Sequence, residues 1–432
     1  MFTAALPRID YRDPWTQPFE DRLAALLRPA AQRVAYLYEK PDTSTFRYRV
    51  FNMVQVLADA PDCAAAWFTR AEIPCLLPLL DRCSALVVCR TRYDEAVGAL
   101  LSRARSLGVE CIFDCDDLVF DPDYVHLVLH TLDQPLYDRA WDHWHAMVGR
   151  ISATLRRCDR AIVTNDFLAA RLRACMPGMD VRVIPNFLER SQLDLSFRCH
   201  EAKLANGLAR DGRIHIGYFS GTPTHARDFA IVAEALASLL RDDARVVLRI
   251  VGFLDPSGPL AEFAARIERF PLQDYLSLQC LIAAVEFNIV PLQDNDFTNC
   301  KSELKFFEAA IVGTTTLASP THAFRAAIRH GETGFLVPSY AWPVALRDAI
   351  AGLEGMPELA ARAFADVQAR YRPEAMLPTI RAALDQAQSW TSAPSAPSTG
   401  SAAGGGTEAA LRSVSAYSVG SPRRVSNGPP PG

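Results

Sequence analysis

Three charged residues stand at helical spacing in the stretch KSELKFFE, residues 301–308. Lys301, Lys305 and Glu308 fall at positions i, i+4 and i+7, so a helix would place all three on one face. Two ammonium groups can bind a diphosphate, and a carboxylate can accept hydrogen bonds from ribose hydroxyls. The alternative is a solvated helix face whose members form ion pairs with one another.

The position of this row along the chain favours ligand binding. It follows the apolar run EFNIVPL, residues 286–292, which is typical of a buried strand. In open α/β sheets, ligands bind where the strands end and the next helices begin. The two lysines would therefore face the place where a diphosphate lies, with Glu308 beside the ribose.

A turn of small residues follows another predicted strand. In GYFSGTPTHARDF, residues 217–229, Ser220, Gly221 and Thr222 are small enough to expose backbone N–H groups to a phosphate. Arg227 adds a cation to the same turn. Because the turn is neither GxGxxG nor a P-loop, an ordinary strand-to-helix turn is the alternative.

Charged groups also follow two predicted strands in the first half of the chain. FDCDDLVFDPD places Asp116 and Asp117 just after a strand. Carboxylates there could act as a base, bind a metal ion or cap a helix. In TSTFRYRVFN, Arg47 and Arg49 with Tyr48 could meet an anionic or sugar ligand across a cleft, or lie on the exposed face of a helix start.

These groups need a scaffold that brings strand ends together, and the hydrophobic pattern predicts one. Runs rich in Val, Ile and Leu alternate with longer helix-like stretches, which is typical of parallel sheets covered on both faces. The alternation restarts after a break near residues 187–212, so we expect two doubly wound, Rossmann-like α/β domains. The predicted strands are RVAYLYE, CSALVVC, VECIFDC, RAIVTN and VRVIPN in the first domain, and RIHIGYFS, VVLRIVG, EFNIVPL, TTTLAS and TGFLVP in the second.

The domain boundaries follow from the same pattern. We expect a first domain over residues 1–188, a second over 189–375, and an amphipathic C-terminal helix over 376–390. Residues 391–432 are rich in Ser, Gly, Pro and Ala. They lack the apolar residues for a core, which predicts a disordered tail.

The composition argues against several classes of protein. Of the 432 residues 50% are hydrophobic, enough for two cores, and the net charge of −4 gives no electrostatic footprint for nucleic acid. No apolar run approaches the roughly 20 residues of a membrane span, and the N-terminus lacks the layout of a signal peptide. The 11 cysteines show no paired spacing. They argue against a zinc site and favour free thiols in a reducing cytoplasm.

With these residues in view, the chain resembles the two-domain GT-B glycosyltransferases that use nucleotide sugars, specifically glycosyltransferase family 4. The resemblance covers approximately residues 33–375, and it implies that the helix over 376–390 packs back on the first domain. FDCDDLVFDP and STFRYRV are similar to a subgroup linked to bacterial surface polysaccharides. The most specific motifs are IVTNDFLAARLR, VRVIPNFLE and KSELKFFEAAIVGTTTLASPTHAFRAAIRHGETGFLVP.

The resemblance also implies roles for individual residues. The second domain would bind the donor and the first the acceptor, and the sugar would be transferred with retention of configuration. Glu308 matches the second Glu of the family's E-x7-E pattern, which binds the donor ribose; the first Glu is replaced by Cys300. The family's usual phosphate-binding Arg and Lys are also missing from their places, and we expect Lys301, Lys305 and Arg227 to replace them.

We therefore expect a glycosyltransferase of surface polysaccharide or glycoconjugate assembly, in the cytoplasm or at the inner face of the plasma membrane. Its partners would be a nucleoside-diphosphate sugar and a glycan or lipid-linked acceptor, with no metal or other cofactor. Lysines and helix N-terminal amides would stabilise the charge that develops on the leaving diphosphate. The alternative, prompted by Cys300, is a non-catalytic GT-B relative that acts as a scaffold or partner subunit in polysaccharide assembly.

Overall fold

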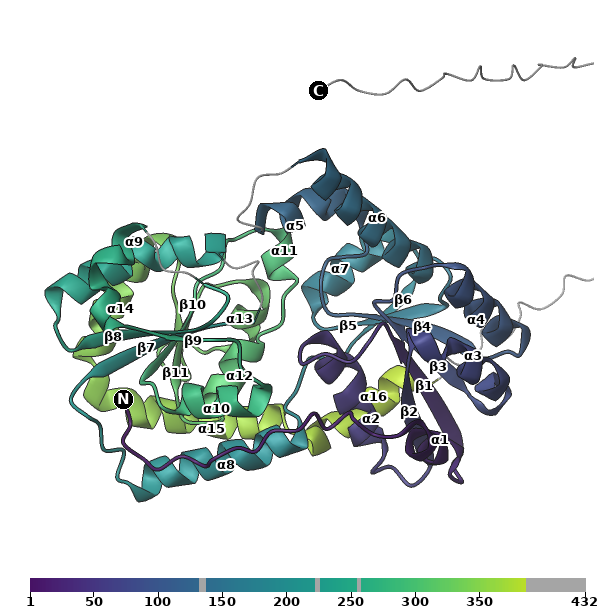
Figure 1. Cartoon of the computed structure of the whole chain (residues 1–432), viewed down its shortest axis with the longest axis horizontal. Coiled ribbons are helices and arrows are strands. Elements are labelled where there is room, and N and C mark those ends of the chain that lie inside the picture. Colours follow the sequence, from purple (N-terminus) through teal and green to yellow (C-terminus); the bar gives the residue numbers. More distant parts are fainter. Residues whose placement is uncertain (132–136, 222–225, 255–257, 386–432) are drawn as a thin grey trace, which may run out of the picture. The chain divides into compact units, whose positions relative to one another are not determined.

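Two parallel β-sheets, one in each half of the chain, organise the protein (Figure 1). The computed structural model describes residues 1–131, 137–221, 226–254 and 258–385, and residues 1–385 form one compact unit. The expected tail and Thr222 lie outside the described residues. Each sheet has six strands, all parallel, so the prediction of two doubly wound α/β sheets is confirmed.

The first sheet has the strand order β2-β1-β3-β4-β5-β6. Alternate residues of its strands pack into different hydrophobic clusters: Ala35 and Leu37 into one, Val34 and Tyr36 into the other. Both faces are therefore covered, as the continuous apolar runs predict. The order reverses between β1 and β3, which places a ligand crevice outside the carboxyl ends of these strands. The strands are β1 (Gln32–Tyr38), β2 (Cys63–Thr69), β3 (Ala85–Cys89), β4 (Glu110–Cys115), β5 (Arg160–Val163) and β6 (Asp180–Val183).

The second sheet has the order β12-β11-β10-β7-β8-β9, which is the dinucleotide-fold order 3-2-1-4-5-6 when its strands are counted from β7. Its topological switch lies between β7 and β10, and the carboxyl ends of these two strands are where a nucleotide is expected. The strands are β7 (Ile214–Ser220), β8 (Val246–Gly252), β9 (Ile267–Phe270), β10 (Phe287–Val290), β11 (Thr315–Ala318) and β12 (Phe335–Leu336).

Helices cover both sheets (Figure 1). One unusual element is the π-helix η1 (Arg47–Phe51), which follows β1 and leads directly into α2. The α-helices are α1 (Phe19–Leu27), α2 (Asn52–Leu57), α3 (Ile73–Leu76), α4 (Glu95–Ser106), α5 (Val125–Thr131), α6 (Asp138–Leu155), α7 (Asp166–Cys175), α8 (Arg190–Ala205), α9 (Ala226–Asp242), α10 (Tyr275–Ala283), α11 (Asp296–Asn299), α12 (Leu304–Ala310), α13 (His322–Ala327), α14 (Trp342–Ala351), α15 (Met356–Arg370) and α16 (Pro373–Leu384).

Two strands were not expected from the sequence. The segment CAAAWFT forms β2, whose three alanines have low strand propensity and are placed by pairing with β1. The segment IERF forms the edge strand β9, where charged side chains interrupt the apolar pattern. The expected strand TGFLVP contributes only the two residues of β12.

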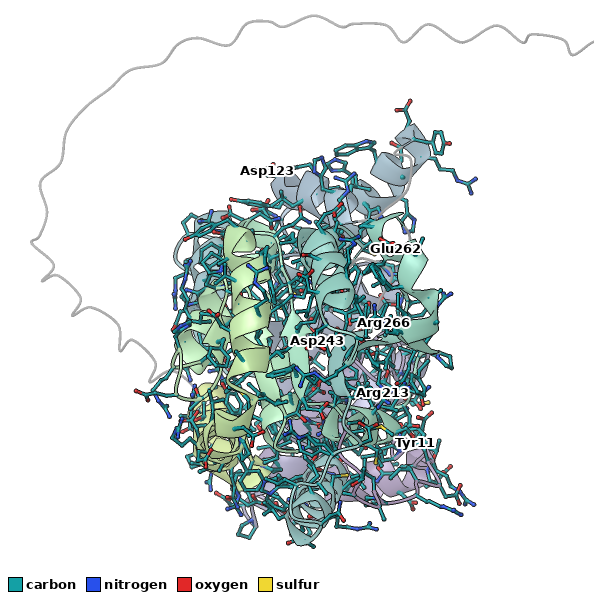
Figure 2. The ribbon with its side chains drawn as sticks, turned by 90° about the vertical axis from the view of Figure 1, so that its left-hand side faces the viewer. Tyr11, Asp123, Arg213, Asp243, Glu262 and Arg266 are labelled. Carbon is teal, nitrogen blue, oxygen red and sulfur yellow. The ribbon has the colours of Figure 1, made fainter. Side chains whose placement is uncertain are left out.

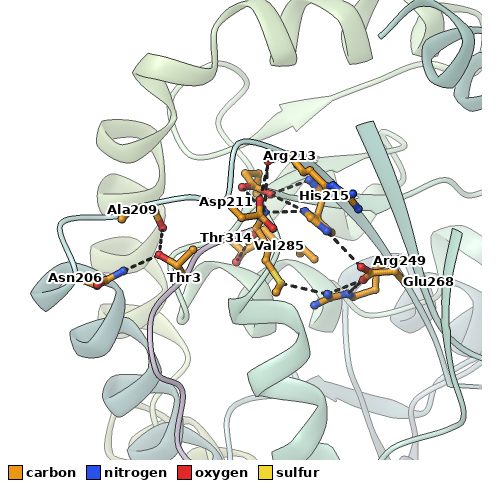
Figure 3. Close-up of polar contacts among 12 residues, drawn as sticks. Thr3, Asn206, Ala209, Asp211, Arg213, His215, Arg249, Glu268, Val285 and Thr314 are labelled. Atoms are coloured by element: carbon orange, nitrogen blue, oxygen red, sulfur yellow. Dashed lines mark hydrogen bonds and ion pairs between the residues drawn. The ribbon is translucent and has the colours of Figure 1, made fainter. Parts of the chain in front are cut away.

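The two ends of the described chain each cross to the other half. Helix α16 packs against α2, and the Arg160 guanidinium at β5 donates to the carbonyls of Ala383 and Leu384, at 2.6 and 3.0 Å. At the other end, Thr3 donates its N–H to Ala209 at 2.9 Å, and Asn206 donates to the Thr3 hydroxyl at 3.0 Å (Figure 3). The predicted first domain therefore begins with a segment that lies against the second half.

Charged side chains of opposite sign pair on the surface of the second half. Glu262 and Asp243, both labelled in Figure 2, form ion pairs with Arg241 and Arg245, each at 2.7 Å. Across the described ranges, no helix combines the length and apolar character needed to cross a membrane.

Candidate active site

A cavity of about 630 Å3 lies where the carboxyl ends of the strands of both sheets meet. The topological switches of the two sheets account for its position, because parallel strands end on the same edge. The cavity brings together most of the residues that the sequence singled out. Those that line it are Arg47, Asp116, Asp117, Ser220, Gly221, Lys301, Lys305 and Glu308.

The turn after β7 is shaped by a close backbone approach from β8. Gly252, at the end of β8, has φ +99°, and a Cβ atom there would lie 1.8 Å from the carbonyl oxygen of Ser220. Only glycine fits this position. The pairing of the two strand ends therefore fixes the backbone of Ser220 at the cavity, which Gly221 also lines.

The charged row at 301–308 does not lie on a single helix. Helix α12 begins at Leu304, so Lys301 precedes it, in the bend that separates α11 from α12. The expectation of three residues on one helix face is wrong in this respect. The three residues nevertheless line the same cavity, and Glu308 is only 4% exposed. The row is therefore not a solvated helix face.

Lys305 presents an ammonium group to the cavity without a partner. Among the described residues, no hydrogen-bond acceptor or carboxylate within ion-pair distance is recorded for its Nζ, which lies 5.4 Å from the centroid of the Tyr218 ring. Burial lowers the pKa of Lys305 to about 8; Asp228 opposes this shift, nearby Lys301 adds to it, and Glu308 opposes it. A partly buried cation with no partner recorded among the described residues is costly, so the site is suited to an anion.

The carboxylate of Glu308 is held by a set of donors from other segments. Its Oε1 accepts from the Tyr48 hydroxyl at 2.5 Å, from Nη2 of Arg47 at 3.3 Å and from Nε2 of Gln192 at 3.2 Å. Tyr48 and Arg47 belong to η1 in the first half, and Gln192 belongs to α8, which joins the halves. The orientation of Glu308 is therefore fixed by two other segments, η1 and α8.

Asp116 and Asp117, just after β4, share one guanidinium. Nη1 of Arg90 donates to Oδ1 of Asp116 at 3.2 Å and to Oδ2 of Asp117 at 3.3 Å, and the Thr45 hydroxyl donates to Oδ2 of Asp116 at 2.9 Å. Burial lowers the pKa of Arg90, but Asp116 and Asp117 raise it well above its usual range. Lys301 lies 4.0 Å from Oδ1 of Asp117, so it joins the acidic loop to the donor side.

Two residues predicted at the site lie elsewhere. Arg49 is fully buried beneath the cavity, where it donates to both carboxylate oxygens of Asp114, at 2.8 and 2.9 Å. The expectation that it meets a ligand, or lies on an exposed helix face, is corrected accordingly, because the π-helix turns its side chain toward the sheet. Arg227 is exposed and does not line the cavity, so the structure does not bring it to Lys301 and Lys305.

Cys300, which stands where the family pattern has its first Glu, does not line the cavity either. It is fully buried in the hydrophobic cluster of the first half, and its carbonyl accepts from Nδ2 of Asn165 at 2.9 Å. Burial raises the pKa of the Cys300 thiol above its usual range. A side chain at position 300 is therefore part of the contact between the halves.

Several residues of the site escaped the sequence analysis. Arg90 directly follows the strand CSALVVC, so the rule that ligands bind where strands end could have found it. Thr45 lies two residues before Arg47 in a segment already noted, in which Tyr48 was expected to act with Arg47 and Arg49. Nothing in the local sequence marks Gln192, because its role depends on contacts with Arg47 and Glu308, which are 145 and 116 residues away.

The cavity contains no recognisable cluster of metal ligands. In the described part of the chain, no group of three or more His, Cys, Asp or Glu side chains is arranged to hold a metal ion. The two carboxylates after β4 face Arg90 and Lys301, which already supply positive charge there.

Comparisons with known proteins agree with the geometry. Residues 213–354 match the family model described as Glycosyl transferases group 1. This segment contains β7 to β12, including the donor-side residues of the cavity. No curated protein matches the chain by sequence.

Solved structures with a similar fold include glycosyltransferases and a sucrose-phosphate synthase. HepE from Anabaena, solved with UDP and glucose, has a TM-score of 0.54 at 12% identity, covering 81% of this chain and 98% of its own. Sucrose-phosphate synthase from Thermosynechococcus elongatus has a TM-score of 0.55 at 17% identity, covering 82% and 98%. A glycosyltransferase from Rickettsia africae has a TM-score of 0.54 at 10% identity, covering 81% and 97%.

At these low sequence identities, the structural similarity supports a shared fold and nothing more. The family match covers part of the second half of the chain. Taken together, they show that the chain has the GT-B fold and that its residues 213–354 are similar to the Glycosyl transferases group 1 family.

Proposed function

We propose that the protein transfers a sugar from a nucleoside-diphosphate sugar to an acceptor hydroxyl, with retention of configuration. The proposal rests on two groups that lie in the same cavity at the switch point of the second sheet. Lys305 supplies an ammonium for which no partner is recorded among the described residues, and Glu308 supplies a carboxylate held by hydrogen bonds. A nucleoside diphosphate needs both groups, since it joins an anionic diphosphate to a ribose with hydroxyl donors. HepE, solved with UDP, shares the fold, which supports this class of donor.

The chemistry assigns a role to each side of the cavity. The acceptor oxygen forms a bond to the anomeric carbon, and the bond from that carbon to the β-phosphate oxygen breaks. The electron pair leaves with the nucleoside diphosphate, so negative charge develops on its β-phosphate. Lys305 and Lys301 line the cavity where they would stabilise this charge, and no step calls on a metal ion.

Asp116 and Asp117 are the candidates for orienting the acceptor hydroxyl. They come from the first half, whereas the donor residues come from the second, so the two sets meet across the cavity. The Asp117 side chain is 23% exposed. Among the described residues, the contact recorded for its Oδ1 is with Nζ of Lys301, at 4.0 Å, so this oxygen can accept a hydrogen bond from an incoming hydroxyl. The hydroxyl proton would pass to this carboxylate or to the departing phosphate.

The first half also gives the cavity an apolar wall. This wall suits an acceptor with an apolar portion, so a lipid-linked acceptor is favoured over a free glycan. The resemblance of FDCDDLVFDP and STFRYRV to the polysaccharide subgroup supports a role in surface polysaccharide or glycoconjugate assembly. The residues of the wall are Val119, Val128, Trp144, Met147 and Ile151.

Thermal denaturation with a panel of nucleoside diphosphates tests the proposal. A ligand that binds only the folded protein raises the free energy of unfolding by about 2.7 kcal/mol at a hundredfold excess over Kd. We expect one nucleoside diphosphate to raise the melting temperature, and the matching nucleotide sugar to be hydrolysed slowly without an acceptor. Failure of every nucleotide to shift the melting temperature would refute the proposal.

The second candidate is a non-catalytic GT-B protein in a polysaccharide assembly complex. It is favoured by Cys300, because the residue that replaces the family's first Glu lies outside the cavity. The same experiment separates the two candidates, since a scaffold that has kept its nucleotide site would show a melting shift without any turnover.

A further inference from the structure

All five residues of η1 are buried, including three consecutive polar or charged side chains, which is unusual for a helical segment. Arg47, Tyr48 and Arg49 are 4%, 3% and 0% exposed. Successive side chains of a helix diverge, so burying all three requires packing on more than one side. Arg49 is directed to Asp114 in the first half, whereas Tyr48 donates to Glu308 in the second. The π-helix therefore connects the two halves; such segments often occur at functional sites.

The hydrogen bonds to Glu308 are strongly asymmetric. All those recorded in the described residues go to Oε1, from Arg47, Tyr48 and Gln192. The other oxygen, Oε2, has no partner there, and it is not among the fully buried polar atoms. Because Glu308 lines the cavity, Oε2 is the oxygen that it presents to a ligand.

The donors to Oε1 are themselves fixed. Arg47 donates its Nε to the Thr43 carbonyl at 2.9 Å and its Nη1 to Oε1 of Gln192 at 2.9 Å. Its guanidinium stacks over the Tyr48 ring, 4.0 Å from the centroid. Burial lowers the pKa of Arg47, but Tyr48 and Glu308 more than offset this, and the pKa lies above its usual range. Arg47 thus stays charged beside Oε1.

We propose that Tyr48 is a positioning residue for the donor site, acting with Gln192 and Arg47. It holds Oε1 of Glu308 so that Oε2 faces the cavity and accepts from the hydroxyls of the donor ribose. This inference rests on the proposed function, which supplies the nucleotide. It adds that the ribose site of the second half is complete only when η1 of the first half is docked against it.

A purely structural role for Tyr48 predicts a loss of stability without a change in the preference for ribose. The chain contains a matched control for this alternative. Tyr371 donates its hydroxyl to Oε1 of Glu303 at 2.7 Å, so it too is a buried tyrosine paired with a buried glutamate. Both tyrosine rings pack on Phe307, at 6.1 Å for Tyr48 and 4.8 Å for Tyr371. Glu303 does not line the cavity, so removing the Tyr371 hydroxyl should affect stability alone.

The test compares binding of UDP with binding of 2′,3′-dideoxy-UDP, or the same pair built on whichever base the protein prefers. Isothermal titration of the wild-type protein should show about tenfold or greater preference for the ribose form, as expected for hydrogen bonds to a carboxylate. In Tyr48→Phe we expect this preference to fall by at least about threefold. In Tyr371→Phe it should stay at the wild-type value, even if the melting temperature drops by a similar amount in both variants.

A second variant guards against a failure of Tyr48→Phe to fold. Gln192 donates to Oε1 of Glu308 but does not line the cavity, so Gln192→Met can affect a ligand only through Glu308 and through Arg47, the other residue that holds Oε1. It should lower the ribose preference in the same direction. Wild-type preference in the folded variants overturns the inference alone, whereas a wild-type protein that binds neither compound overturns it together with the proposed function.

Discussion

The carboxylates on the two sides of the cavity differ in how firmly they are held. The Glu308 side chain is 5% exposed, and its Oε1 accepts from three donors on two other segments, η1 and α8. Asp116 and Asp117 have side chains that are 12% and 23% exposed, and they share the single guanidinium of Arg90. A deeply fixed carboxylate suits recognition of a constant group, whereas more open carboxylates suit a partner that arrives and leaves. This difference is what we expect if, as proposed, the second half binds the donor and the first half serves the acceptor.

The largest expected effect comes from removing a carboxylate charge on the acceptor side of the cavity. Asp116→Asn and Asp117→Asn keep the shape of the side chain but remove its charge. If either carboxylate orients or deprotonates the acceptor, kcat should fall by roughly 10²–10⁴ for that variant. The Kd of the nucleoside diphosphate should barely change, because the donor residues lie on the other side.

The same variants separate the alternatives for the acidic loop. Asn caps a helix nearly as well as Asp, so a capping role predicts near-normal turnover in both variants. A metal site predicts turnover that depends on a divalent ion in the wild type and loses this dependence in the variants. Measuring kcat with and without a chelator distinguishes the three outcomes.

The next effect concerns the donor side. Glu308→Gln should raise the Kd of the nucleoside diphosphate by about 10- to 150-fold, since a charge-assisted hydrogen bond contributes about 1.5–3 kcal/mol. Titration calorimetry measures this. Glu303→Gln is the control, because Glu303 is buried on the same segment but pairs with Tyr371 away from the cavity. An unchanged Kd in Glu308→Gln would remove Glu308 from the donor site.

A smaller effect should appear as a dependence on pH. The pKa of Lys305 is lowered to about 8, so the ammonium is charged below pH 8 and neutral above it. Affinity for a nucleoside diphosphate should therefore be highest below pH 8 and fall by up to about tenfold per pH unit above it. In Lys305→Met the affinity should be lower throughout and lack this decline. A wild-type affinity that stays flat from pH 7 to about 9.5 would show that Lys305 does not contact the diphosphate.

The smallest expected effect concerns position 300. The Cys300 thiol lies in the hydrophobic cluster of the first half and not at the cavity, so Cys300→Ala should leave kcat/KM within about twofold of wild type. The melting temperature should fall modestly because the substitution leaves a small void. A large loss of turnover in a stably folded variant would mean that this position acts in the reaction after all.

The sequence predicted which residues line the cavity better than it predicted their contacts. The strand-end rule identified Lys301, Lys305 and Glu308, because it depends only on local pattern and on sheet topology. It failed for Arg49, whose side chain is turned inward by a π-helix that no local signal predicts. It also missed Gln192, whose contacts with η1 and α12 form only when distant segments pack together.

The most direct test of the central claim is a crystal structure of the protein with a bound nucleoside diphosphate. We expect the ribose hydroxyls within about 2.5–3.2 Å of Oε2 of Glu308 and the β-phosphate beside the ammonium of Lys305. The hydroxyl of Tyr48 should keep its contact with Oε1. A nucleotide bound with its ribose away from Glu308, or with its diphosphate away from Lys305, would contradict the account.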